Sequence, residues 1–133
     1  MSREAKMAIP AKEVAMCYVW SLAVILCLAV SPLRAQDPVN VAPKQCKVEF
    51  ENDQVRVLRW KTGPHEKTPM HEHPAMVSIA VTGGHTRFTL ADGKTSEVTI
   101  KAGQVTWSAP EKHSSENLDG KPSELIQVEL KGK

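Results

Sequence analysis

Three of the five histidines of this chain, His65, His71 and His73, lie within nine consecutive positions. In a β-strand, residues i and i+2 project from the same face, so His71 and His73 would place two imidazoles side by side. Two such rings can share one divalent metal ion, but an ion needs at least three protein donors to be held firmly. The third donor must come from elsewhere in the chain, and His113 is the candidate.

The segment that contains these histidines also offers further donors. His65 lies in a proline-bounded loop six residues before His71, and we take it as the preferred candidate for a fourth ligand. Glu66 and Glu72 are the alternatives. Strand parity continued beyond His73 predicts that Val77 shares the face of the two histidines.

Seven residues stand at spacings that resemble a known pattern: His71, His73 and Gly84, then Gly103, Pro110, His113 and Asn117. The pattern is similar to the two short motifs of the cupins, in particular of small single-domain cupins of the RmlC-like type. The resemblance covers about residues 50–130. It implies a jelly-roll β-barrel with a metal ion inside, held by the two histidines of the first motif and the one of the second. Homodimerisation is a further expectation from the family.

This chain departs from the two cupin motifs at three places. Val77 occupies the position where the family usually carries a glutamate ligand, Gly63 stands further from His71 than the motif has it, and the loop between Pro110 and His113 is shortened. Three neutral imidazoles would leave a bound ion with its full double charge and with open positions for other ligands. Some thiol dioxygenases of the superfamily use three histidines on iron, so the valine does not exclude metal chemistry.

The elements that must position these residues are strands. Residues 46–50 and 54–61 alternate around an Asn52-Asp53 turn, and residues 76–82 form a mostly apolar run. Residues 85–90 and 95–101 flank Asp92-Gly93, a strong hairpin signal, and further strands are expected at 104–108 and 123–131. No segment after residue 36 shows the apolar period of a long helix. The sequence therefore predicts an all-β, antiparallel jelly-roll barrel over residues 46–133, preceded by a linker or arm at 36–45.

The first 35 residues resemble an export signal. Basic residues precede an apolar run at 14–30, and Ala35 offers a small residue at a cleavage position. The alternative is an uncleaved anchor, since the uncharged stretch 14–33 has the roughly 20 residues that a bilayer requires. Either way, the domain is expected in the periplasm or outside the cell, anchored to a membrane in the second case.

Charge and cysteine content exclude several other functions. After Ala35 the chain carries 13 basic and 13 acidic residues without a basic cluster. The sequence therefore does not predict a positively charged surface for binding nucleic acid or an anionic membrane. Neither Cys17 nor Cys27 follows the small residue of a lipoprotein signal. Cys46 is the one cysteine after residue 35 and is expected to act as a small hydrophobe.

The function expected from these observations is that of an exported cupin that presents one divalent ion (Fe, Mn, Ni or Zn) to a small organic molecule. Met70, Val77 and Trp107 are predicted to line the pocket over the metal. If the protein is an enzyme, a non-haem iron dioxygenase is the favoured class. The alternative is a module that binds or senses a ligand or a metal without breaking a bond, because fold does not determine activity.

Overall fold

The computed structural model describes residues 36–132, so the predictions for the apolar segment at 1–35 lie outside the described residues. One short helix precedes nine strands: α2 (Pro38–Val41), β1 (Cys46–Glu51), β2 (Val55–Thr62), β3 (Lys67–His73), β4 (Met76–Ala80), β5 (Gly84–Leu90), β6 (Thr95–Ile100), β7 (Val105–Ser108), β8 (Glu111–Asn117) and β9 (Ser123–Leu130). Within residues 36–132, no helix is both long enough and apolar enough to cross a bilayer.

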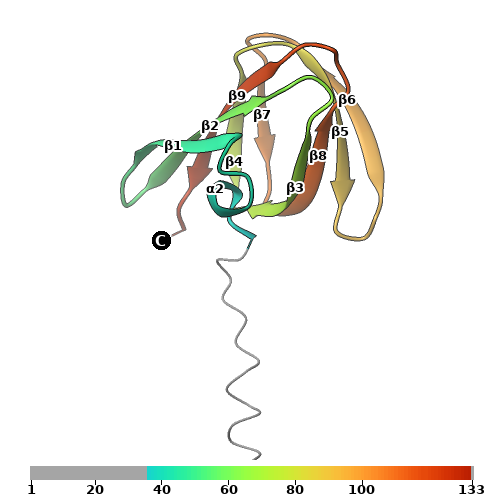
Figure 1. The fold of residues 1–133 in the computed structure, drawn as a ribbon. Helices are drawn as coiled ribbons and strands as arrows, with labels where there is room; N and C mark the ends of the chain where they lie inside the picture. The colour runs from blue at the N-terminus through green and yellow to red at the C-terminus, as the bar shows by residue number, and fades with distance from the viewer. Residues whose placement is uncertain (1–35, 133) are drawn as a thin grey trace, which may run out of the picture. The chain divides into compact units, whose positions relative to one another are not determined.

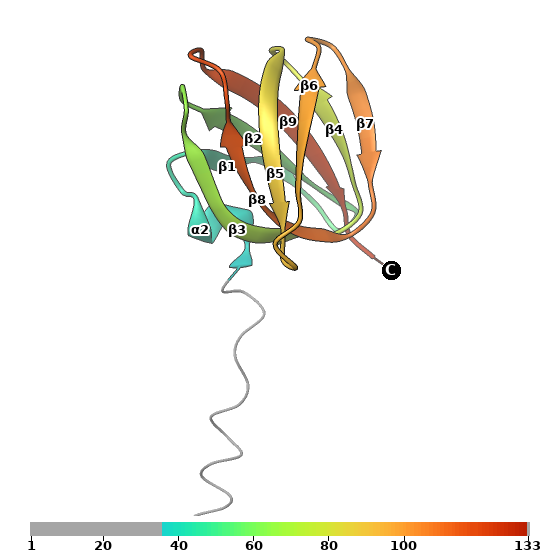
Figure 2. The ribbon, with the colours of Figure 1, turned by 90° about the vertical axis from the view of Figure 1, so that its right-hand side faces the viewer.

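The nine strands form two antiparallel sheets that face each other (Figure 1). One sheet has the order β1-β2-β9-β4-β7 and the other the order β3-β8-β5-β6. Figure 2, viewed from the side of the four-stranded sheet, shows β3, β8, β5 and β6 in front of the second sheet. The antiparallel jelly-roll expectation is therefore confirmed.

Turn chemistry explains the two hairpins that the sequence predicts. The Asn52 side chain accepts hydrogen bonds from the backbone N–H groups of Gln54 and Val55, each at 2.8 Å, and so joins β1 to β2. Between β5 and β6, Gly93 has φ of 84°, a left-handed conformation that glycine adopts without strain. These local signals fix the two hairpins independently of the rest of the barrel.

The N-terminal arm, residues 36–45, packs onto the barrel. Asp37 caps α2 by accepting a hydrogen bond from the backbone N–H of Val39 at 3.0 Å, with Pro38 as the first helical residue. Ala42 joins a small apolar cluster with Cys46, Leu58 and Trp60. Burial raises the pKa of the Cys46 thiol to about 12, so this cysteine stays protonated and acts as a hydrophobe.

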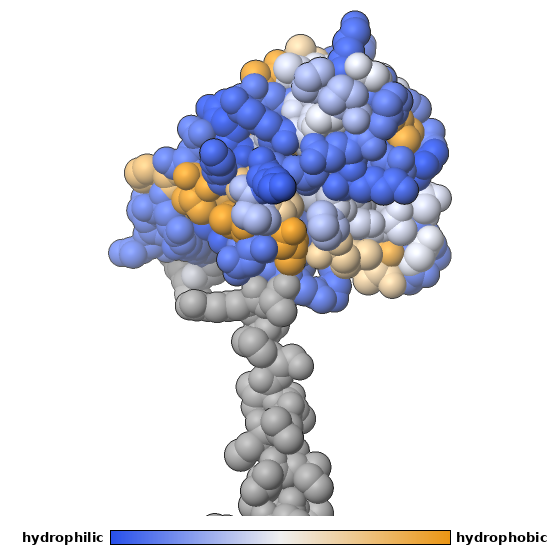
Figure 3. All heavy atoms as spheres, in the orientation of Figure 1, coloured by the Kyte–Doolittle hydropathy of each residue, from blue (hydrophilic) through white to orange (hydrophobic). Residues whose placement is uncertain are grey.

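The space between the sheets contains many polar side chains. The buried polar and charged residues are Gln45, Thr68, His71, His73, Ser78, His113, Asn117, Gln127 and Glu129. Hydrophilic residues also cover most of the face seen in Figure 3, so the outside of this face looks like an ordinary protein surface. A polar interior is costly unless its groups are paired, which indicates a site rather than a plain core.

Candidate metal centre

Pairing of β3 with β8 brings the three histidines together. His71 lies directly opposite His113, and His73 lies two residues further along β3 on the same inward face. One candidate donor nitrogen from each residue lies within 4.8 Å of the others, and all three side chains are buried. Donors of one tetrahedral ion with metal–nitrogen bonds of about 2.1 Å lie about 3.4 Å apart, so the rings would move closer together on binding a shared ion. We call these three residues the histidine cluster.

The hydrogen bonds of the cluster fix which nitrogen is free. The Nδ1–H of His71 donates to the carbonyl oxygen of Pro69 at 2.7 Å, and the Nδ1–H of His73 donates to Oε1 of Glu129 at 2.7 Å. Because a carbonyl and a carboxylate oxygen accept, both rings carry a proton on Nδ1, and the neutral form of each ring has its lone pair on Nε2. His113 has its Nδ1 at 3.4 Å from Oε1 of Glu111.

Burial also keeps the cluster ready for a cation. It lowers the pKa of His71 to about 4 and the pKa of His113 to about 3, with the neighbouring histidines adding to the shift of His113. Both rings are therefore neutral at neutral pH, which is the form that binds metal.

The environment of one nitrogen atom indicates whether the cluster suits a metal ion. Nε2 of His73 is buried and has no hydrogen-bond partner among the described residues. A buried polar atom without a partner is costly, whereas the same lone pair aimed into a group of three imidazoles is a normal metal ligand. The residues present therefore fit a divalent ion.

The remaining candidate donors are not in the cluster. Among the described residues, the group able to hold an ion contains His71, His73 and His113 and no fourth member. His65 lies exposed in the turn before β3, with a left-handed φ of 54°. Glu66 accepts a hydrogen bond from the backbone N–H of Gly63 at 2.6 Å in the same turn. Glu72 alternates with the two histidines along β3 and so projects from its other face.

The expected parity between His73 and Val77 is corrected by the structure. β3 ends at His73, and β4 starts at Met76 in the opposite sheet, so the alternation does not continue through the intervening residues. The buried residues of β4 are Met76, Ser78 and Ala80, and Val77 lies between them beside Trp107 of β7. No inward position of β4 carries a carboxylate.

The residues expected to line the pocket lie elsewhere. Trp107 is 61% exposed, and Met70, Val77 and Trp107 are absent from the walls of the three described cavities that include a residue of the histidine cluster. The first cavity, of about 80 Å³, has His71, His113 and Trp60 in its wall. The second, of about 260 Å³, shares His113 and Phe88 with the first.

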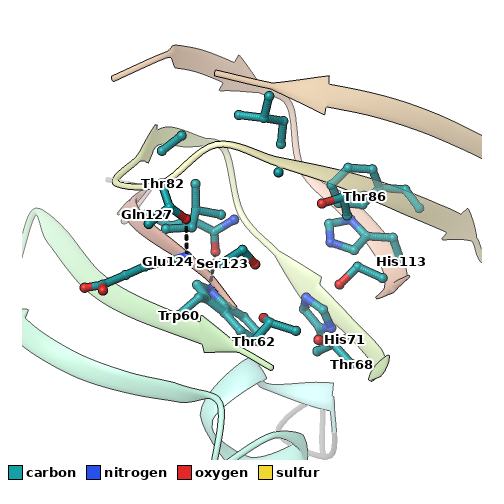
Figure 4. A pocket seen from close by; sticks show the side chains of 16 residues that line it. Trp60, Thr62, Thr68, His71, Thr82, Thr86, His113, Ser123, Glu124 and Gln127 are labelled. Atoms are coloured by element: carbon teal, nitrogen blue, oxygen red, sulfur yellow. Dashed lines mark hydrogen bonds between the residues drawn. The ribbon is translucent and has the colours of Figure 1, made fainter. Parts of the chain in front are cut away.

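Six of the residues that line the smaller cavity carry hydroxyl groups. They are Thr62, Thr68, Thr82, Thr86, Ser115 and Ser123. Figure 4 shows His71 and His113 on one side of the cavity near Thr86 and Thr68, with Trp60, Gln127 and Ser123 on the other. The Nε1–H of Trp60 donates to Oε1 of Gln127 at 2.6 Å. Among the described residues, no lysine or arginine lines these two cavities, whereas Arg56 and Lys112 line a third cavity beside His73.

Sequence reasoning missed Glu129, the buried carboxylate nearest to the cluster. It comes from β9 in the opposite sheet and contacts Nδ1 of His73, not a donor nitrogen. Burial acts to raise the pKa of Glu129, but hydrogen bonds from His73 and Arg56 outweigh it and hold that pKa below its usual range. The alternation of residues 123–131 placed Glu129 on one face of a strand but gave no sign that this face meets the histidines.

Comparison with known proteins agrees with this architecture. No protein-family model and no curated protein matches the chain. A cupin domain from Bordetella pertussis superimposes with a TM-score of 0.62 at 20% identity, over 65% of this chain and 92% of that chain. An uncharacterised protein with a double-stranded β-helix domain from Klebsiella pneumoniae superimposes with a TM-score of 0.55 at 17% identity, over 79% of this chain and 91% of that chain.

A third solved structure, an RmlC-like cupin with a double-stranded β-helix fold from Methanocaldococcus jannaschii, gives a TM-score of 0.52 at 16% identity, over 64% of this chain and 77% of that chain. At these identities the likeness concerns the fold. The chain therefore has the double-stranded β-helix fold of these cupin structures.

Proposed function

We propose that this protein holds one divalent metal ion through Nε2 of His71, His73 and His113 and presents it to a small organic molecule inside the barrel. The observation that carries the proposal is the buried Nε2 of His73, which has no partner among the described residues while its Nδ1–H is fixed by Glu129. A lone pair oriented in this way is suited to a metal.

The reaction class that this site supports best is that of a non-haem iron dioxygenase. A divalent ion bound by three neutral nitrogens supplies a Lewis acid with open coordination positions. The protein contributes a buried cavity, in which Trp60 packs against His71 with ring centroids 5.1 Å apart and Phe88 packs against His113 at 5.2 Å. These rings exclude water and hold the imidazoles in place.

The cavity walls restrict the substrate. Threonine and serine hydroxyls both donate and accept hydrogen bonds, and they suit an uncharged, polar molecule. Among the described residues, the first two cavities are lined by the carboxylates of Glu124 and Glu111 and by no lysine or arginine, so they disfavour an anionic group. Arg56 and Lys112 line a separate cavity beside His73. We therefore propose a small neutral substrate with oxygen or sulfur groups.

Elemental analysis of the purified chain tests the metal site. We expect close to one equivalent of a transition metal in the unaltered protein and a loss of most of it in His71→Ala. His85→Ala is the matched control, because His85 lies outside the cluster, 3.3 Å from Glu97. Equal metal content in all three proteins would exclude the histidine cluster as the site.

Oxygen uptake by the iron-loaded protein tests the reaction. We expect turnover with at least one compound from a panel of small thiols, diketones and phenols. A protein that binds iron at the cluster but consumes no oxygen with any of them would contradict the dioxygenase and leave the non-catalytic binding module.

We also propose that the domain is exported and that residues 1–35 are removed. Asp37, two residues after the proposed cleavage site, caps α2 and pairs with Arg56, so the cleaved chain keeps both contacts. N-terminal sequencing of the protein recovered from the periplasm should give Gln36 as the first residue. An intact N-terminus in a membrane fraction would support the anchor instead.

A further inference from the structure

A continuous chain of charged side chains leads from the N-terminal arm to His73. Oδ2 of Asp37 lies 2.7 Å from Nη1 of Arg56, and Nε of Arg56 lies 2.6 Å from Oε2 of Glu129. The other oxygen of Glu129, Oε1, accepts the Nδ1–H of His73 at 2.7 Å. Each link is a short, charge-assisted hydrogen bond.

Burial restricts the charged side chains of this series to one set of partners. Glu129 is 2% exposed and uses both carboxylate oxygens, one toward Arg56 and one toward His73. A buried carboxylate requires such partners, because an unpaired buried charge is strongly destabilising. Arg56 in turn bridges two carboxylates, and their hydrogen bonds raise its pKa above the usual value despite partial burial. The guanidinium therefore remains charged and holds Glu129 in one orientation.

The arm that supplies Asp37 is itself fixed next to β3. Its last residue, Gln45, donates from Nε2 to the carbonyl oxygen of Lys67 at 3.0 Å and accepts from the Thr68 hydroxyl at 2.8 Å. Pro38 and Ala42 are buried. The arm thus contacts the barrel at both ends, through Asp37 on β2 and through Gln45 on the strand that carries His71 and His73.

We propose that Asp37, Arg56 and Glu129 form a positioning relay that fixes the Nδ1–H tautomer of His73 and thereby makes tight metal binding depend on the docked N-terminal arm. This proposal rests on the metal site proposed above. Partners of this kind orient a ligand imidazole and raise its basicity, and their loss typically lowers metal affinity by about 10- to 100-fold. None of the three residues touches the ion in this scheme.

The test compares metal affinity in variants of the full chain, by competition with a chromophoric chelator. We expect the largest loss in Glu129→Leu, about 10- to 100-fold. Glu129→Gln keeps the shape of the side chain but offers one acceptor oxygen to two donors, Arg56 and His73, so it should also lose affinity, though less than Glu129→Leu. Arg56→Met and Asp37→Ala should follow with progressively smaller losses, since each lies one contact further from His73.

The matched control is Arg59→Met. Arg59 lies on the same strand as Arg56 and also bridges two carboxylates, those of Glu49 and Glu124, neither of which pairs with a residue of the histidine cluster. Its loss should leave metal affinity within about twofold of the unaltered chain. Equal losses in Arg56→Met and Arg59→Met would show a general effect on stability and would overturn the relay.

A second measurement needs no metal. Long-range proton–nitrogen NMR correlations identify the tautomer of each neutral imidazole, and we expect the Nδ1–H form of His73 in the unaltered chain and a mixture of tautomers in Glu129→Leu. An unchanged tautomer in a folded Glu129→Leu chain would contradict the proposal. If the unaltered chain binds no metal, this measurement still tests the relay, so the two proposals fail separately.

Discussion

His71 of β3 and His113 of β8 are direct cross-strand neighbours, with ring centroids 4.8 Å apart. The pairing of these two strands therefore builds most of the histidine cluster, and His73 joins it from the same face of β3. Since a shift of one residue in register turns every side chain to the opposite face, the cluster exists only in this pairing.

The stability of the metal-free protein should fall as the pH drops from about 6.5 to about 3. Burial lowers the pKa of His71 to about 4 and that of His113 to about 3, against an ordinary value of 6.5. In this window the unfolded chain binds protons that the folded chain excludes, so acid favours unfolding. Each pKa unit corresponds to about 1.36 kcal/mol, which gives a total on the order of several kcal/mol.

Urea denaturation of the metal-free chain at pH 7 and at pH 4.5 measures this loss. The double variant His71→Gln, His113→Gln serves as the control and should show a smaller difference between the two pH values. The same pH dependence in both proteins would mean that other groups cause the acid sensitivity.

Trp60→Phe should destabilise the protein by about 1–3 kcal/mol, because it leaves the buried Oε1 of Gln127 without its donor. Trp107→Phe is the matched control. Trp107 is 61% exposed, and its substitution should change stability by no more than about 0.5 kcal/mol. Chemical denaturation of both variants gives the comparison, and similar losses would be inconsistent with a buried Trp60–Gln127 pair.

Asn117→Ala should loosen the turns beside the cavity. The Asn117 amide donates to the carbonyl oxygens of Gly63 and Lys121, at 2.9 and 2.7 Å, and its Oδ1 accepts the N–H of Asp119 at 3.1 Å. At about 1 kcal/mol for each bond, the expected loss is about 3 kcal/mol.

Hydrogen exchange should report this change as faster exchange at His65 and Asn117, whose N–H groups pair across the same turns. Asn52→Ala, which removes an exposed turn contact between β1 and β2, is the control and should leave these amides protected. Unaltered protection in Asn117→Ala would argue against this role of the side chain.

Thr86→Leu should separate substrate binding from metal binding. Thr86 faces the cavity of about 80 Å³, so leucine would remove a hydroxyl group and place a larger, apolar side chain in the space beside His113. We expect normal metal content with at least tenfold weaker binding of an active compound, about 1.4 kcal/mol. Thr89→Leu makes the same change at a position of β5 outside both cavities and should leave binding unaltered. Equal effects of the two variants would place the substrate elsewhere.

Local patterns were sufficient for much of the barrel. The Asn52 turn and the Asp92-Gly93 turn predict their hairpins correctly, because turn residues act through contacts within a few positions. β8 is harder to predict from the sequence, since its residues EKHSSEN show no apolar alternation. Its inward residues His113 and Asn117 are polar because they face the site and the adjacent turns, so a hydrophobic pattern is not expected there.

The prediction that residues of β3 and β4 alternate as one strand was wrong for a physical reason. Pro74 and Ala75 separate two strands that belong to different sheets, and the alternation of faces applies only within one strand. The prediction that Val77 shares the face of the histidines assumed an unbroken strand. The pocket predictions at Met70 and Trp107 likewise lacked any information on which strand faces meet across the barrel.

The sequence by itself determined the fold class, the hairpins and the three histidines, because residue types, short spacings and turn chemistry are local properties. The tertiary structure decided what surrounds those histidines. Glu129, Arg56 and Asp37 come from β9, β2 and the N-terminal arm, and they meet His73 only when the two sheets face each other and the arm is docked. No short-range pattern encodes such contacts, since they depend on the register and packing of the whole barrel.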